Sequence, residues 1–339
     1  MLTVDGAPSR ATQRGGVKRL ELVLSGAARR PTLRSSRHPA AKAAGQAPLV
    51  GRASSLASNR SDRKKSGITG MPETNQPVDT TAAEAYEKHM VPGMFLRWTE
   101  RVVSLAAPQP GEHVLDVACG TGIGARVSAS GVGLAGKIVG LDIDPGVVEV
   151  ARKVAQEAGI PIEWHCASAL KMPFNAAEFD LCLCLQGLQF FPDRVGGFAE
   201  IRRVLKPSGR LVASIWGSLE YNKGHYAVVQ ALERQNVDAA PAKRACSLAS
   251  ADEIRDTATR AGFTSIELRA EDGVSHFASI RSFIDGMTVG SPSTRHAVAL
   301  LSEDGRERFV KDVSAMLEPY LTHGELAYPM RTFILVARP

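Results

Sequence analysis

The sequence lacks long apolar runs and has few cysteines. No window approaches the roughly 18 consecutive apolar residues that a membrane-spanning helix needs. The longest candidate, residues 181–191, is short and contains two glutamines. The five cysteines are odd in number and several lie in apolar stretches, which favours buried thiols in a reducing compartment over a disulfide framework. We therefore expect a cytoplasmic protein without a membrane span.

Acidic residues are scarce in the first 78 residues. This segment holds 14 of the 41 basic residues but only 4 of the 35 acidic ones, so the rest of the chain has more acidic than basic residues. A groove that binds nucleic acid needs clustered positive charge. We therefore expect no nucleic-acid partner for residues 79–339.

Residues 1–78 are rich in Arg, Ser, Ala and Gly and show no hydrophobic face, which predicts a disordered basic N-terminal extension. Three origins stay open for it. Met71 opens an ordinary polar N-terminus, so the stretch before it can be a start-site artefact. The composition is also typical of a transit peptide, although Asp5 and Glu21 weigh against that. The third origin is a basic tail that binds nucleic acid or a membrane. We favour a solvated arm without function, and place one domain at residues 79–339.

Strand and helix patterns alternate in the middle of the chain. A helical segment comes first, at residues 82–106, and Pro92 is predicted to divide it into two helices. Short apolar runs then predict strands at 113–118, 137–142, 162–167, 179–185 and 210–216. Helices are predicted at 122–130, 145–158 and 193–205, followed by a turn at 206–209. Helical crossovers of this length require parallel strands, so the pattern predicts a doubly wound α/β sheet.

The last third of the chain is less regular. It predicts helices at 226–234 and 251–261, strands at 265–270 and 331–337, and a mostly helical segment at 277–321. Ligands of doubly wound sheets bind at the carboxyl ends of the strands. We expect the helical residues 220–235 and 277–321 to form a lid over that edge.

A glycine-rich turn follows the first predicted strand in the run VLDVACGTGIG. Gly120 and Gly122 allow a ligand to approach the backbone, and the next helix offers unpaired N–H groups. The run also satisfies the dinucleotide pattern G-x-G-x-x-A through Ala125, with Asp142 at the distance of a ribose-binding acid. Asp116 distinguishes the two possible ligand types, because a carboxylate here repels a pyrophosphate and attracts a cationic ligand.

Five motifs follow one another along the chain: VLDVACGTG at 114–122, GLDID at 140–144, KMPF at 171–174, FDLCLCLQGLQFFPD at 179–193 and LKPSGRLVAS at 205–214. Their order and spacing resemble the class I S-adenosylmethionine-dependent methyltransferases, and most closely the type 11 small-molecule branch that includes quinone-biosynthesis methyltransferases. The resemblance implies a seven-stranded Rossmann-like sheet of order 3-2-1-4-5-7-6, with strand 7 antiparallel and formed by the TFILVAR run. It also implies S-adenosylmethionine as the cofactor.

The resemblance assigns the methionine part of the cofactor to the glycine-rich turn. Ala118, Cys119, Gly120 and Gly122 would contact this part of the ligand. Asp116 would bind its amino group, directly or through water. Ala118 stands where the family has its first glycine.

The resemblance assigns the adenosyl part to the ends of the next strands. Asp142 would accept both ribose hydroxyls, a charge-assisted arrangement, and Ile143 would pack on the adenine. Ser168 and Ala169 would lie at the adenine edge, where many family members carry an acid in place of Ser168. Gln186 would line the sulfonium end of the cofactor, unless it only satisfies backbone groups at the end of its strand.

Methyl transfer needs alignment and exclusion of water, and needs a general base only if the acceptor arrives protonated. Trp216, Tyr221 and His225 follow the fifth strand near the expected mouth of the site. We take His225 and Tyr221 as the candidate catalytic residues, although a histidine here can also be a surface residue at a helix start. Cys182 and Cys184 share one face of a strand without further ligands nearby, so we expect no metal site.

The first hypothesis is therefore methyl transfer from S-adenosylmethionine to a small-molecule acceptor. The apolar faces of the lid favour a partly hydrophobic acceptor such as a quinone, a phenol or a lipid. A nicotinamide-dependent oxidoreductase is one alternative, but no Tyr-x-x-x-Lys pair has the required spacing. The other is a non-catalytic S-adenosylmethionine-binding protein, which a blocked acceptor pocket would reveal. The segment after the fourth strand lacks the Asn-Pro-Pro-Tyr-like motif typical of nucleic-acid methyltransferases.

Overall fold

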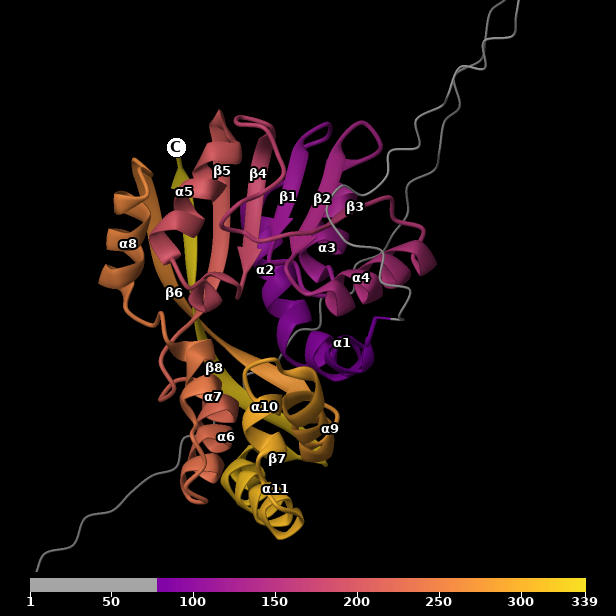
Figure 1. Ribbon diagram of the computed structural model, residues 1–339, viewed down its shortest axis with the longest axis vertical. Coiled ribbons are helices and arrows are strands. Elements are labelled where there is room, and N and C mark those ends of the chain that lie inside the picture. Colours follow the sequence, from indigo (N-terminus) through magenta and orange to yellow (C-terminus); the bar gives the residue numbers. More distant parts are fainter. Residues whose placement is uncertain (1–77) are drawn as a thin grey trace, which may run out of the picture. The chain divides into compact units, whose positions relative to one another are not determined.

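Eight strands form one sheet within residues 78–339, the part of the chain that the computed structural model describes (Figure 1). The strands are β1 His113–Val117, β2 Lys137–Asp142, β3 Glu163–Cys166, β4 Phe179–Leu185, β5 Leu205–Trp216, β6 Ser265–Phe277, β7 Leu321–Thr322 and β8 Glu325–Arg338. Their order is β3-β2-β1-β4-β5-β8-β6, and β7 lies off this path, paired with β8. The predicted disordered extension lies outside the described residues, apart from Val78.

The first five strands are parallel, and β8 runs antiparallel to its three partners, β5, β6 and β7. Residues 114–117 of β1 and 181–184 of β4 are buried without a break, as is typical of parallel strands that helices cover on both faces. With the two-residue β7 set aside, this is the 3-2-1-4-5-7-6 order. The doubly wound Rossmann-like fold is therefore confirmed.

Helices cover both faces of the sheet. The α-helices are α1 Thr81–Ala85, α2 Leu96–Ala106, α3 Ile123–Val132, α4 Pro145–Glu157, α5 Arg194–Val204, α6 Lys223–Glu233, α7 Ala240–Lys243, α8 Ala251–Arg260, α9 Ile280–Asp285, α10 Arg295–Ala299 and α11 Glu303–Leu317. α2 and α3 share a hydrophobic core with one set of strand side chains, and α5 and α8 with another. No helix within residues 78–339 is long and apolar enough to cross a membrane.

The helical segment before β1 is continuous through Pro92. Residues Tyr86–Phe95 form a π-helix, η1, which joins α1 directly to α2. In an α-helix a proline ring clashes with the carbonyl four residues earlier and leaves that carbonyl without a donor. The wider i→i+5 turn of a π-helix changes this geometry. The prediction of two helices separated at Pro92 was therefore wrong.

Three other predicted boundaries differ from the structure. Residues 206–209 lie inside β5, where the pairing shifts from Phe179 with Leu205 to Leu181 with Arg210 and so forms a bulge. β6 and β8 are each longer than predicted, and pair continuously from Ser265–Arg338 to Phe277–Leu326. Cross-strand hydrogen bonds set these lengths, and they have no local signal in the sequence.

The long ends of β6 and β8 carry a lid made of α6, α7, α9, α10 and α11 (Figure 1). Its hydrophobic core includes Phe277, Phe283, Phe309 and Tyr328, and it reaches Trp216 at the carboxyl end of β5. Parallel strands end at one edge of a sheet, so the turn after β1 lies at this edge too. The expected lid is thus present at the carboxyl ends of the strands.

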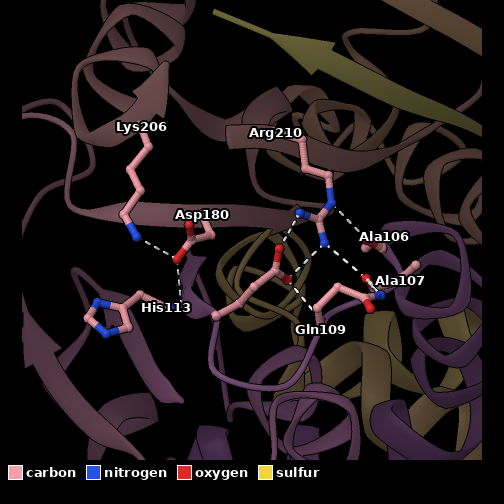
Figure 2. A network of polar contacts seen from close by, with 8 residues as sticks. Ala106, Ala107, Gln109, His113, Asp180, Lys206 and Arg210 are labelled. Atoms are coloured by element: carbon pink, nitrogen blue, oxygen red, sulfur yellow. Dashed lines mark hydrogen bonds and ion pairs between the residues drawn. The ribbon is translucent and has the colours of Figure 1, made fainter. Parts of the chain in front are cut away.

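A polar network holds the opposite edge of the sheet together (Figure 2). The guanidinium of Arg210 donates to both carboxylate oxygens of Glu112, at 2.7 and 2.9 Å. It also donates to the carbonyl oxygens of Ala106 and Ala107 at the end of α2, at 2.8 and 3.0 Å. These bonds satisfy C-terminal carbonyls that a helix leaves unpaired, and they join α2 to β5.

The second carboxylate of this network belongs to Asp180 in β4 (Figure 2). Its Oδ2 accepts from the backbone N–H of His113, at 2.9 Å, and from the Lys206 ammonium, at 2.7 Å. The bulge in β5 carries Lys206, so an irregular stretch of strand supplies a partner for a strand-end carboxylate.

Candidate active site

The turn between β1 and α3 folds as the glycine pattern requires. Ala118, Gly120 and Gly122 all have positive φ, at 54°, 53° and 83°. A Cβ on residue 122 would lie 2.3 Å from the Trp164 ring, which backs the turn from β3. Glycine is therefore required at position 122 for its backbone angle and for space, whereas Ala118 adopts the left-handed conformation despite its side chain.

Asp116 lies beneath this turn and is 1% exposed. Its Oδ2 accepts a hydrogen bond from the Ala125 N–H at 2.8 Å, in the first turn of α3. A Cβ on residue 124 would lie 2.6 Å from that oxygen, so Gly124 makes room for the carboxylate. Burial raises the pKa of Asp116 to about 7, although the bond from Ala125 opposes this rise. A cationic ligand would stabilise the ionised form.

Asp142 ties the end of β2 to the same turn. Its Oδ2 accepts from the Gly120 N–H at 2.9 Å, and its Oδ1 accepts from the Asp144 N–H at 3.0 Å. Burial raises the pKa of Asp142, and these two backbone bonds oppose the rise. Each oxygen keeps further acceptor capacity, since a carboxylate has about four acceptor positions. The carboxylate is thus oriented by the backbone and can still bind hydroxyls.

The residues expected around the adenine lie beyond Asp142. Ile143 is 70% exposed, which is unusual for a large apolar side chain at a strand end and fits a position that a flat ring would cover. The Ser168 hydroxyl accepts from the Leu170 N–H at 3.2 Å. Ala169, next to it, is partly buried. Ser168 therefore uses part of its capacity inside its own turn.

Gln186 directly follows β4 and lies in the left-handed region, with φ of 60°. Its amide nitrogen donates to the Thr332 hydroxyl and its amide oxygen accepts from Gln189, both at 3.2 Å. A non-glycine residue in this conformation is held there by its surroundings, and such residues gather at functional sites. The side chain is satisfied by other side chains rather than by backbone, and its role toward a cofactor stays a prediction.

The two candidate catalytic residues differ in burial. His225 is 5% exposed, because α6 begins two residues earlier and turns the ring toward Trp216. The alternative of a surface histidine was therefore wrong. Burial lowers the pKa of His225 to about 4. Tyr221 is 42% exposed, and the guanidinium of Arg331 lies 3.8 Å from its ring centroid. The geometry leaves His225 as a neutral imidazole inside the lid and Tyr221 at its surface.

Sequence reasoning missed Glu87 in η1. Arg126, in the first turn of α3, donates to Glu87 Oε1 at 2.6 Å and to the Thr121 carbonyl oxygen in the glycine-rich turn. The other oxygen, Glu87 Oε2, is buried without a hydrogen-bond partner among the described residues. Arg126 could have indicated an acidic partner, because a cation near a helix N-terminus is unfavourable unless a carboxylate lies nearby.

Seven buried polar atoms within residues 78–339 have no hydrogen-bond partner, and four of them belong to residues of the candidate site or to residues that contact it. These four are Glu87 Oε2, Thr121 Oγ1, Gln189 Oε1 and His225 Nδ1. Buried polar groups are almost always paired in proteins. All four atoms can accept a hydrogen bond, His225 Nδ1 in the tautomer that carries its proton on Nε2. The unsatisfied set fits a ligand that brings positive charge and hydrogen-bond donors.

The cysteines contribute no reactive group to this edge. Cys119 is 7% exposed in the turn, and burial raises the pKa of its thiol well above the ordinary value. Thiol reagents should therefore react slowly with Cys119. Among residues 78–339, no three His, Cys, Asp or Glu side chains gather as a metal site would require.

Comparison with known proteins gives one family. Residues 115–213 match the family model described as a methyltransferase domain. The demethylmenaquinone methyltransferase of Lactococcus lactis is 35% identical over 116 residues, which are 34% of this chain and 46% of that protein. The aklanonic acid methyltransferase DauC of a Streptomyces species is 38% identical over 118 residues, 34% of this chain and 54% of that protein. The matched segment thus spans about half the length of these relatives.

A solved structure extends the similarity beyond the matched segment. The YcgJ protein of Bacillus subtilis superposes with a TM-score of 0.50 at 16% identity, over 71% of this chain and 98% of that one. At this identity the likeness concerns the fold alone. The superposed share of this chain is larger than residues 115–213, so the likeness in fold extends beyond that segment.

Proposed function

We propose that the chain is a class I S-adenosylmethionine-dependent methyltransferase, since residues 115–213 match a methyltransferase-domain model, and that it transfers a methyl group from S-adenosylmethionine to a small-molecule acceptor. The observation that carries this proposal is the buried carboxylate of Asp116 beneath the glycine-rich turn. A nicotinamide dinucleotide would place a pyrophosphate beside that carboxylate, and the two would repel each other. S-adenosylmethionine brings an ammonium and a sulfonium instead. Neither alternative function gains support, because the family model and the relatives are methyltransferases.

The electrostatics of the turn favour a ligand of this charge. Asp116 has its pKa raised to about 7 by burial, so removing its proton at neutral pH is unfavourable without a cation nearby. The unpaired Glu87 Oε2 adds a second acceptor on the side of η1. We propose that Asp116 and Glu87 bind the ammonium group from opposite sides, while Ala118, Cys119, Gly120 and Gly122 supply backbone contacts.

The adenosyl part lies along the ends of β2 and β3 in this proposal. Asp142 accepts the two ribose hydroxyls with the oxygen capacity that its backbone bonds leave free. Ile143 covers one face of the adenine, which would bury its exposed side chain. Ser168 and Ala169 bound the adenine edge, where a serine hydroxyl replaces the charged acceptor of other family members.

The chain's own residues mainly align the reactants and keep water out. When bound, S-adenosylmethionine supplies a methyl group on a positively charged sulfur, which leaves as a neutral thioether. Gln186 fixes the sulfonium end through its rigid contacts to Thr332 and Gln189. The lid excludes water from the strand ends. His225 stays our candidate for the group that accepts a proton, and Tyr221 lies at the mouth of the site. The low pKa of His225 suits a methyl acceptor that ionises readily.

The acceptor in this proposal is a small, partly apolar molecule rather than a nucleic acid. The relatives named above act on a demethylmenaquinone and on aklanonic acid, as their names state. The excess of acidic residues in 79–339 disfavours a polyanionic partner. We also propose that these residues are one methyltransferase domain. The five cysteines, all within the described part and all free, support a reducing compartment such as the cytoplasm.

The test is calorimetric titration of the full chain with S-adenosylmethionine, S-adenosylhomocysteine and NADPH. We expect both adenosyl ligands to bind and NADPH to fail. Asp142→Ala should weaken the adenosyl ligands by about 100-fold, because it removes two charge-assisted hydrogen bonds. Glu307→Gln neutralises an exposed carboxylate on α11 and serves as the control.

Three results would decide between the functions. Binding that Asp142→Ala abolishes and Glu307→Gln preserves supports the cofactor assignment. Binding of NADPH alone would favour the oxidoreductase hypothesis and refute the argument from Asp116. Tight cofactor binding without methyl transfer to any member of a panel of phenols, quinols and acids would favour the non-catalytic protein.

A further inference from the structure

A surface pocket of about 480 Å³ lies beside the lid, between the segment after β4 and the segment around α7. This volume lies within the range of small-molecule sites. Phe190, Phe191 and Pro192 form its apolar side. Phe190 also packs against the core of the lid, and Phe191 packs against the core of the sheet. The pocket therefore sits where the lid meets the sheet.

The charged residues that line this pocket are all basic. They are Arg194, Lys243 and Arg244. Arg194 pairs with Glu253 at 2.6 Å, and Lys243 pairs with Glu233 at 2.6 Å. No ion pair forms on the exposed Arg244 within residues 78–339. Arg244 is thus the cation that an incoming acidic group would meet.

One residue of the pocket lining has a buried acceptor without a hydrogen-bond partner among the described residues. Gln189 lines the pocket, yet it is 2% exposed. The amide nitrogen of Gln189 donates to Gln186 Oε1. The amide oxygen, Gln189 Oε1, has no hydrogen-bond partner among the described residues. A buried amide oxygen without a donor is rare. A ligand hydroxyl or amine would satisfy it.

The same glutamine connects the pocket to the proposed methyl-transfer site. Gln189 contacts Gln186 at 3.2 Å, and Gln186 lies at the end of β4 beside Thr332. A molecule bound against Gln189 would therefore be one side chain away from the residue assigned to the sulfonium end.

We propose that this pocket receives the methyl acceptor, and that the acceptor is a planar apolar molecule with an acidic group and a hydroxyl or amine. The apolar body lies on Phe190 and Phe191, the acidic group meets Arg244 at the rim, and the donor reaches Gln189 Oε1. This inference rests on the proposed function and names its substrate class. It predicts discrimination between acceptors by charge, which a lid that only excludes water would not show.

Three related aromatic probes test each part of the inference. Hydroxynaphthoate has the acid and the hydroxyl, naphthol has the hydroxyl alone, and naphthoate has the acid alone. Each is titrated into the full chain saturated with S-adenosylhomocysteine. We expect hydroxynaphthoate to bind about tenfold more tightly than either partial probe, since each partial probe lacks one polar contact.

Two variants separate the contacts. Arg244→Glu should weaken the two acidic probes by about tenfold and leave naphthol unchanged, because it replaces attraction by repulsion at the rim. Arg244→Lys should retain most of the affinity. Gln189→Leu should weaken the two hydroxyl probes and leave naphthoate unchanged. Arg308→Glu makes the same charge change on an exposed site of α11, outside the pocket lining, and should alter none of the three.

The outcomes distinguish this inference from the proposed function. Equal affinity for all three probes, or an equal loss of probe affinity in Arg308→Glu and Arg244→Glu, overturns the inference. The proposed function is unaffected by either result if S-adenosylhomocysteine still binds. Failure of S-adenosylhomocysteine to bind overturns both, because no methyl donor would then meet an acceptor here. Probe-specific losses in both pocket variants, with S-adenosylhomocysteine affinity unchanged in Arg244→Glu, support the inference.

Discussion

The two ends of the parallel strands both carry partly or fully buried carboxylates, but their partners differ. At the amino end, Glu112 and Asp180 are paired with Arg210 and Lys206 (Figure 2). At the carboxyl end, Asp116 and Asp142 are held by backbone N–H groups, and no basic side chain pairs with either within residues 78–339. Basic side chains thus neutralise the carboxylates at the amino end, whereas the carboxylates at the carboxyl end form no ion pair among the described residues.

The pKa values follow the same division. Burial acts on Glu112 and Asp180 too, but their basic and backbone partners outweigh it and leave both pKa values below the ordinary range. Burial prevails at Asp116 and Asp142, and their pKa values are raised. In our proposal, a bound cation offsets the free-energy cost of burying the ionised second pair. The amino end therefore serves stability in this proposal, and the carboxyl end serves binding.

The largest effect should come from removing the charge at the carboxyl end. Asp116→Asn can keep an oxygen for the Ala125 N–H but loses the negative charge. We expect S-adenosylmethionine to bind about 100-fold more weakly, because a desolvated charge contact is lost. The melting temperature should not fall, since the variant removes a buried ionisable group that has no basic partner. Calorimetry and thermal denaturation of the same samples measure both. A fall in stability with intact affinity would reverse the comparison.

The second prediction concerns the amino end of the strands, where removing a basic side chain should lower stability and leave cofactor affinity intact. Arg210→Met leaves Glu112 and the carbonyls at the end of α2 without their donor. We expect a loss of about 2 kcal/mol in the free energy of unfolding, because the partner charge is partly buried. Affinity for S-adenosylmethionine should stay within about twofold, since additivity holds for distant sites.

Denaturant titration measures the stability of this variant. Arg308→Met is its control, because Arg308 is exposed on α11 and should cost almost nothing when replaced. If Arg210→Met weakened the cofactor as strongly as Asp116→Asn does, the two ends of the sheet would not be independent.

The raised pKa of Asp116 makes both stability and cofactor affinity depend on pH. The pKa of Asp116 rises from 3.8 to about 7 on folding, so the folded protein binds an extra proton between these values. The contribution of this group to stability is therefore full at low pH and is lost as the pH rises through 7. The proposed cation needs the carboxylate, so its affinity should be about tenfold weaker at pH 6 than at pH 8.

The measurement is a pair of titrations at the two pH values in buffers of different ionisation enthalpy. Binding at pH 6 should release a proton to the buffer. Asp116→Asn should bind weakly at both values without this proton release. The same proton release in the variant would assign the titration to another group.

The smallest effect concerns the strained turn. Ala118 has φ of 54°, where a side chain is unfavourable. Ala118→Gly should therefore raise the free energy of unfolding by less than about 1 kcal/mol, because relief of strain is partly offset by the added freedom of the unfolded chain. Cofactor affinity should hardly change. A clear loss of stability would mean that the Ala118 methyl group packs usefully against Gly187.

Local patterns were sufficient for the elements that build the site. The apolar runs of β2 and β4 predicted their bounds without error, and the turn from Ala118 to Gly122 was assigned from its glycines. Buried parallel strands and tight turns have strong signals because each residue's environment is set by its neighbours in sequence. The roles of the individual site residues toward a cofactor remain predictions.

Other features depended on contacts between distant segments. Pro92 indicated a helix break, and the packing of η1 against the rest of the chain maintains a π-helix instead. His225 was ambiguous until the lid buried it. Glu87 and Arg126 are 39 residues apart and share no pattern that a local reading detects. Such pairings arise only when the chain is folded.

The order of strands and helices, the acidic glycine-rich turn and the position of Asp142 follow from the amino-acid pattern alone, since hydrophobic periodicity and backbone preferences act over a few residues. The charge balance at each end of the sheet, the protonation of Asp116 and His225, and the junction of lid and sheet at Gln189 follow from packing. Burial and electrostatic environment are properties of the assembled fold, because they depend on which distant groups displace water from each side chain.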